Sequence, residues 1–109
     1  MTTVTVTKIK ERFKSIECDG HTGYGVEGED IVCAALSSIV QTAALGILSV
    51  AGVNADYRIN EERGWLKLTL PDNMTQSQLH DSDIIIKTLL LGVSDLHESF
   101  SDFVELEVK

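Results

Sequence analysis

Basic residues are scarce in this sequence, which holds 9 Lys and Arg against 17 Asp and Glu and carries a formal net charge of −8. Binding to phosphate groups needs concentrated positive charge, so this balance argues against a protein that contacts nucleic acid directly. An acidic surface does suit a basic protein partner, although many soluble proteins are acidic for solubility alone.

Cysteine is rarer still, since the chain contains Cys18 and Cys33 and no other. Two cysteines make no disulfide framework, and no C-x-x-C pair of the kind that binds zinc is present. The N-terminal residues 1–13 also lack the basic and then apolar design of an export signal. We therefore expect a cytoplasmic protein with two free thiols, and we expect neither a bound metal nor a cofactor.

Charged residues are missing altogether between Ile31 and Ala55. An apolar run of that length could span a membrane. This run contains serine, threonine and glutamine, however, is dominated by alanine rather than leucine, and has no basic flanks. We therefore expect a helix buried inside a small domain, without membrane contact.

No internal linker or low-complexity tract interrupts the 109 residues, so we expect a single domain over residues 1–109. Alternating apolar residues predict strands at 3–9, 12–19, 53–59, 66–70 and 102–108. The first two strands form one predicted hairpin. The third and fourth form another around the polar turn 60–64.

Two long helices are predicted by apolar residues that recur at helical spacing. In the first helix these residues are Leu36, Val40, Ala43, Ile47 and Val50. Gly52 is expected to end this helix, and the second helix begins at a capping box of Thr75 and Gln78 and extends its apolar face to Phe100. The expected fold is α+β in the order β-β-α-β-β-α-β, with both helices packed on a mainly antiparallel sheet.

The first helix places Cys33 near its start. Asp30 is a preferred capping residue just ahead of the apolar pattern, which would make Cys33 the third helical position. There the positive end of the helix dipole favours a reactive thiolate. Cys18 lies in the middle of a predicted strand and is expected to fill the core. Free cysteine is often buried, so the same role is the alternative for Cys33.

His21 directly follows the second predicted strand. A histidine returned toward the helix start can accept the proton of a thiol and later protonate a leaving amine. Asp30 could orient this histidine as well as cap the helix. The alternative for His21 is an ordinary loop residue. His80 and His97 lie at polar positions of the second helix and are expected at the surface.

Glycine is concentrated between His21 and Cys33. A glycine-rich turn before a helix can cradle phosphate, but here neither Rossmann nor Walker A spacing is met and acidic neighbours would repel the anion. A mobile lid that closes over an extended peptide makes better use of the segment. The residues expected in this substrate loop are Gly20, Gly23, Gly25 and Gly28.

The segment Gly20–His21, its glycine-rich spacer and Gly28-Glu-Asp-Ile-Val-Cys33-Ala-Ala resemble the signature of the bacterial ribosomal-processing cysteine protease Prp, or YsxB-like, family. The similarity covers essentially the whole chain. It implies that His21 and Cys33 form a catalytic pair and that Asp30 matches the adjacent acidic position. It also implies a homodimer that removes the N-terminal extension of a large-subunit ribosomal protein, the twenty-seventh of its series.

The expected reaction is acyl transfer, in which Cys33 attacks a peptide carbonyl and His21 shuttles the proton. Amides at the helix start, such as those of Cys33 or Ala34, could hold the oxyanion. The small residues Ala34, Ser38 and Gln41 form a stripe suited to close packing against the sheet or a second subunit.

Two alternatives remain open. One is a non-catalytic dimeric factor that binds a basic ribosomal protein during ribosome assembly through its acidic surface. The other is a small thiol hydrolase that acts on metabolites. The presence of both a nucleophile and a base favours an enzyme over the non-catalytic factor.

Overall fold

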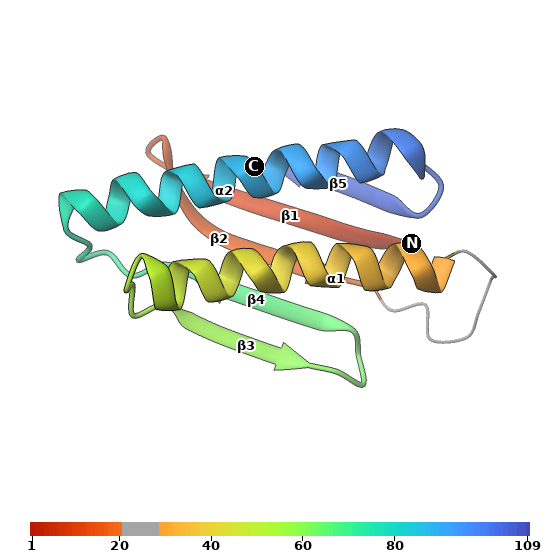
Figure 1. Cartoon of the computed structure of the whole chain (residues 1–109), viewed down its shortest axis with the longest axis horizontal. Helices are drawn as coiled ribbons and strands as arrows, with labels where there is room; N and C mark the ends of the chain where they lie inside the picture. Colours follow the sequence, from red (N-terminus) through yellow and green to blue (C-terminus); the bar gives the residue numbers. More distant parts are fainter. Residues whose placement is uncertain (21–28) are drawn as a thin grey trace.

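Two long helices lie on one face of a five-stranded sheet (Figure 1). The computed structural model describes residues 1–20 and 29–109, with the backbone alone for Glu29 and Asp30. The elements are β1 (Thr2–Ile9), β2 (Arg12–Asp19), α1 (Glu29–Leu45), the π-helical segment η1 (Gly46–Val50), β3 (Asp56–Asn60), β4 (Trp65–Thr69), α2 (Gln76–Ser99) and β5 (Val104–Val108). This order confirms the predicted α+β chain.

The sheet has the strand order β3-β4-β2-β1-β5. The two hairpins pair antiparallel, as does β2 with β4, whereas β5 runs parallel to β1. Consequently β2 and β3 run in the same direction, as do β4 and β5. Each helix makes the long crossover that a connection between such strands requires. The sheet is therefore mainly antiparallel, as predicted.

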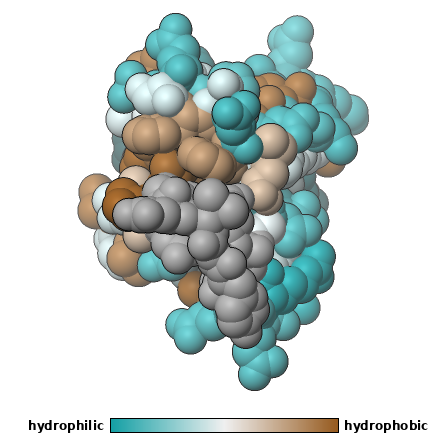
Figure 2. Space-filling model, turned by 90° about the vertical axis from the view of Figure 1, so that its right-hand side faces the viewer, coloured by the Kyte–Doolittle hydropathy of each residue, from teal (hydrophilic) through white to brown (hydrophobic). Residues whose placement is uncertain are grey.

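The segment Ile31–Val50 is long and apolar enough, by length and composition, to cross a membrane. One face of it packs on the sheet, where Leu36 and Ile47 are fully buried, as expected for a core helix. The other face is open, since Ile31 is 73% exposed. Figure 2 views the end of the molecule on the right of Figure 1 and shows hydrophobic residues gathered mainly on the helix side.

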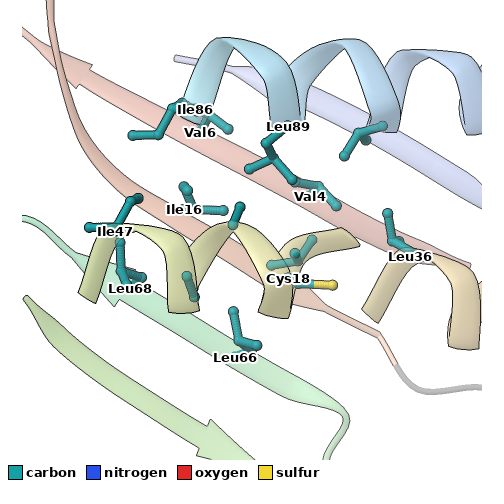
Figure 3. Close-up of a cluster of buried hydrophobic side chains, with 14 of the residues drawn as sticks. Val4, Val6, Ile16, Cys18, Leu36, Ile47, Leu66, Leu68, Ile86 and Leu89 are labelled. Atoms are coloured by element: carbon teal, nitrogen blue, oxygen red, sulfur yellow. The ribbon is translucent and has the colours of Figure 1, made fainter. Parts of the chain in front are cut away.

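The core lies between the sheet and the helices (Figure 3). Val4 and Val6 on β1 and Ile16 and Cys18 on β2 are buried, as their alternation predicted. The buried helix residues are Val32, Leu36, Val40, Ala43, Ala44, Ile47, Ser82, Ile86, Leu89 and Val93. Apolar residues recur every two positions on the strands and every three or four positions on the helices. These two spacings therefore identify the residues on the two sides of one core.

Two residues expected on these apolar faces lie outside the core. Val50 is 85% exposed because it belongs to η1, where the Ala51 N–H donates to the Gly46 carbonyl at 2.9 Å. The wider π turn rotates Val50 away from the buried face. Phe100 is 41% exposed because α2 ends at Ser99, so the side chain no longer follows the helical spacing.

Helix α1 begins at Glu29, so Asp30 is its second residue and not the cap that we expected ahead of it. Acidic residues are favourable in the first turn, and glutamate forms helix more readily than aspartate, so the helix extends to Glu29. Cys33 is consequently the fifth residue of α1. The oxyanion role expected for the amides of Cys33 and Ala34 stays a prediction.

Candidate active site

β1 begins, β2 ends and α1 begins at the same end of the sheet (Figure 1), and Cys33 belongs to the first turns of α1. Its sulfur is 3.0 Å from the hydroxyl oxygen of Thr2, the first residue of β1. The same hydroxyl donates a hydrogen bond of 3.0 Å to the Gly20 carbonyl. One side chain of β1 thus contacts both the candidate nucleophile and the residue that follows β2.

A cavity of about 190 Å³ lies beside Cys33. Ser37 and Gln41 line it and follow Cys33 at intervals of four residues, so the three residues share one face of α1. The opposite wall comes from the β3–β4 hairpin, with Ile59, Asn60, Glu61, Gly64, Trp65 and Leu66. This volume is below that of a typical cofactor pocket and suits a peptide side chain.

Trp65 is held at the cavity by its neighbours on β2. Its indole N–H donates to a Glu17 carboxylate oxygen at 2.6 Å. The Arg63 guanidinium stands 5.6 Å from the Trp65 ring and donates to Asp19 at 3.1 Å. These contacts join the β3–β4 hairpin to the strand that leads to Gly20, and they fix one wall of the cavity.

Cys18 also lines this cavity, but it is 7% exposed and belongs to the core, as predicted. Burial first, and then the nearby Cys33 and Asp19, raise the pKa of the Cys18 thiol to about 11. Cys18 is therefore protonated and weakly nucleophilic at neutral pH. Cys33 is only partly buried and is the more accessible of the two thiols.

Gly20 occupies a position that no other residue fits. Its φ of +122° is a conformation that other residues rarely adopt, and an added Cβ would stand 2.4 Å from the Met1 carbonyl oxygen. It would also approach the Thr2 Cα to 3.0 Å. Glycine here allows the end of β2 to touch the start of β1. Its further role in a substrate loop stays a prediction.

Four of the predicted site residues, His21, Gly23, Gly25 and Gly28, lie outside the described residues. The side chain of Asp30 lies outside them too, although its backbone is part of α1. The pairing of His21 with Cys33 and the supporting role of Asp30 therefore stay predictions.

The two described histidines are exposed on α2, as expected. His80 Nδ1 lies 3.3 Å from Asp81, and His97 Nδ1 donates to the Val104 carbonyl at 2.6 Å. Within residues 1–20 and 29–109, no group of three or more His, Cys, Asp or Glu side chains could hold a metal ion. Of the three histidines in the chain, His21 is thus the one that directly follows Gly20, which is hydrogen-bonded to Thr2 beside Cys33.

The sequence analysis missed several cavity residues, among them Thr2, Ser37 and Trp65. Ser37 could have been found, because it follows Cys33 by four residues on a helix. Thr2 and Trp65 had no such signal, since they reach Cys33 only through strand pairing. The predicted stripe of small residues is also divided: Gln41 lines this cavity, whereas Ser38 lines a groove between α1 and α2.

Comparison with known proteins gives a consistent result. A family model described as cysteine protease Prp matches residues 1–105. The ribosomal processing cysteine protease Prp of Bacillus subtilis is 22% identical over 88 residues, which cover 81% of this chain and 79% of that protein. The protein of the same name from Staphylococcus aureus is 24% identical over 110 residues, which cover both chains completely.

Solved structures show the same fold. The S. aureus protease Prp in complex with a substrate peptide superposes with a TM-score of 0.88 at 23% identity, covering 100% of each chain. SMU.848 from Streptococcus mutans superposes with a TM-score of 0.86 at 28% identity, covering 99% of this chain and 93% of that one. These likenesses confirm the α+β fold.

The first prediction concerns the close approach at Gly20. Gly20→Ala should lower the free energy of unfolding by roughly 3 kcal/mol, because a strained φ and a backbone clash act together. Gly52→Ala is the matched control, with φ +66° and nothing within 4 Å of an added Cβ, and should cost only about 1 kcal/mol. Urea denaturation measures both values. Equal losses would show that the approach at Gly20 carries no energetic constraint.

The second prediction follows from the burial of Cys18, which is the largest cause of its raised pKa and does not depend on Cys33. In a Cys33→Ala variant, alkylation of Cys18 by iodoacetamide should be slow at neutral pH, because the thiolate is scarce. Its rate should rise with pH until the pH passes the pKa. Mass spectrometry measures the rate, and unfolded protein provides the control for an unburied thiol. Rapid labelling of folded Cys18 at neutral pH would contradict its burial.

Proposed function

The chain belongs to the cysteine protease Prp family, and on that premise we propose that it is a ribosomal-processing endopeptidase. Its proposed substrate is the N-terminal extension of a bacterial large-subunit ribosomal protein, the twenty-seventh of its series. The observation that carries the proposal is the partly buried Cys33 thiol beside a cavity that suits a peptide side chain.

The similar S. aureus protease gives further support, because its structures hold a substrate peptide in one case and a covalently linked product peptide in another. Both cover the whole of this chain. A covalently linked product is what a nucleophilic mechanism leaves on an enzyme before hydrolysis. We therefore extend peptide binding and covalent catalysis to this chain.

In the proposed reaction the Cys33 sulfur attacks the scissile carbonyl carbon while His21 takes the thiol proton. The C–N bond then breaks, and His21 returns the proton to the leaving amine. Water, deprotonated by the same histidine, attacks the thioester and releases the second product and the thiol. The described residues include the nucleophile Cys33 and the cavity along α1. They also include Gly20, which contacts the start of β1 and directly precedes the base His21.

The acidic composition fits this substrate class. A ribosomal protein is basic. A chain of net charge −8 attracts it at distances within the Debye length, where salt does not screen the charges. The proposal places the enzyme in the cytoplasm, where ribosomal proteins are made, with no membrane contact and no direct contact with nucleic acid.

We also propose a homodimer formed through the helices. A groove of about 570 Å³ between α1 and α2 is lined largely by apolar residues, including the exposed Ile84 (51%) and Val50 (85%). Gly46 and Gly92 also line it, and an added Cβ would meet Ile85 and Ile39 of the facing helix at 3.5 Å, so these glycines let α1 and α2 pack closely beneath the groove. A second copy of the chain would cover apolar surface that the described monomer exposes.

The third prediction tests catalysis. Cys33→Ala and His21→Ala should each abolish cleavage of a peptide that spans the end of the ribosomal-protein extension. The double variant should be scarcely worse than either, because the two residues act as one unit. His80→Ala is the matched control on the exposed face of α2 and should retain activity. Mass spectrometry of the products provides the measurement.

The rival functions give other outcomes in the same assay. A non-catalytic assembly factor would leave the peptide intact, and Cys33→Ala would scarcely affect cells. A metabolite hydrolase would leave the peptide intact but cleave small thioesters in a Cys33-dependent manner. Cleavage by purified Cys33→Ala at the wild-type rate would refute the catalytic pair.

The fourth prediction tests assembly. Light scattering at micromolar concentration should give about twice the mass of one chain. Ile84→Glu, within the groove, should reduce this to the monomer mass, because a dimer would have to bury the new charge. Ile59→Glu is the matched control, since Ile59 is similarly exposed (48% against 51%) but lies outside the groove. A monomeric wild-type protein at all concentrations would sink the proposal.

A further inference from the structure

Thr2 interrupts an apolar row on β1. The inward residues of this strand are Thr2, Val4 and Val6, and they are 3%, 0% and 0% exposed. A valine at position 2 would have nearly the same shape and would fill the same space. A buried hydroxyl is costly unless it is hydrogen-bonded, so packing alone does not account for threonine here.

The hydroxyl of Thr2 meets two groups. It donates to the Gly20 carbonyl at 3.0 Å, and its oxygen lies 3.0 Å from the Cys33 sulfur. A hydroxyl carries one proton and can also accept. While the proton points to Gly20, the oxygen can accept from the Cys33 S–H. When the hydroxyl turns about its Cβ–Oγ1 bond, the same proton points to the sulfur.

The positive end of the α1 dipole stabilises a thiolate at Cys33 less than the position of Cys33 in the sequence suggested. The helix dipole acts within the first turn, and Cys33 is the fifth residue of α1. The effect of a side-chain donor in contact with the sulfur does not depend on how far Cys33 lies from the helix start. Thr2 is such a donor, and it stands on a strand and not on the helix itself.

We propose that Thr2 positions the Cys33 sulfur and stabilises its thiolate by donating a hydrogen bond to it. This inference rests on the proposed role of Cys33 as the nucleophile. As the thiol proton leaves for the general base, the Thr2 hydroxyl turns from the Gly20 carbonyl to the sulfur. Once the sulfur has bonded to the substrate carbon, it carries no charge, and the hydroxyl returns to Gly20. No atom is gained or lost at Thr2.

The experiment measures iodoacetamide alkylation of Cys33 across a range of pH, with peptide mapping to separate Cys33 from Cys18. Thr2→Val removes the hydroxyl and keeps the shape and the backbone N–H, which donates to Phe103 at 2.9 Å. Alkylation of Cys33 at neutral pH should slow about tenfold, and the pH profile should move up by about one unit, as expected for losing a hydrogen bond to a charged group. Thr2→Ser keeps the hydroxyl and should restore both.

Circular dichroism and intact mass establish that the variants share the fold and the N-terminal residue. If Thr2→Val does not fold, Thr2→Ala takes its place against Thr2→Ser. A wild-type pH profile in the variant without the hydroxyl would overturn the inference and leave Thr2 as a structural tie to Gly20. An equal change in Thr2→Ser would do so too, because it would point to packing.

Peptide cleavage measured on the same samples separates this inference from the proposed function. A Cys33 profile that depends on the hydroxyl, in a protein that cleaves no peptide, would reject the function and keep the role of Thr2. Normal cleavage, together with a Cys33 pH profile that is independent of the hydroxyl, would keep the proposed function and reject the role of Thr2.

Discussion

The close contact between Gly20 and the start of β1 is the constraint on which the site depends. The Gly20 backbone leaves no room for a side chain beside Met1 and Thr2, and the Gly20 carbonyl accepts a hydrogen bond from the Thr2 hydroxyl. This contact fixes the end of β2 against the beginning of β1. The Thr2 oxygen is then within 3.0 Å of the Cys33 sulfur on α1. The environment of the thiol is therefore set by the meeting of two strands as much as by the helix that carries it.

The topology brings the remaining walls to the same place. β2 runs toward this end of the molecule, α1 runs away from it, and β3 returns in the direction of β2 (Figure 1). The β3–β4 turn therefore comes back beside the first turns of α1, where Trp65 is held by Glu17 of β2. The cavity beside Cys33 thus forms from segments distant in sequence.

Much of the fold could be predicted from the sequence because it depends on local periodicity. Val4, Val6 and Ile16 alternate into the core, and Thr75 with Gln78 forms the predicted capping box. The exposure of Val50 could not be predicted, because a π turn changes the helical phase without a marked change in composition. At the site, Cys33 was identified from its predicted position in the first turn of a helix. Its contact with Thr2, across 31 residues, depends on the finished tertiary structure.

The pairing of β5 with β1 has a consequence for when the thiol becomes ordered during synthesis. Thr2 pairs with Val104, and its backbone N–H donates to the Phe103 carbonyl. A ribosome must therefore translate roughly a hundred further codons before the strand that carries Thr2 acquires this neighbour. Contacts of such long sequence separation form late in folding. A nascent chain that already exposes Cys33 thus lacks the strand neighbour of Thr2, so the surroundings of this thiol are complete only after β5 has left the exit tunnel.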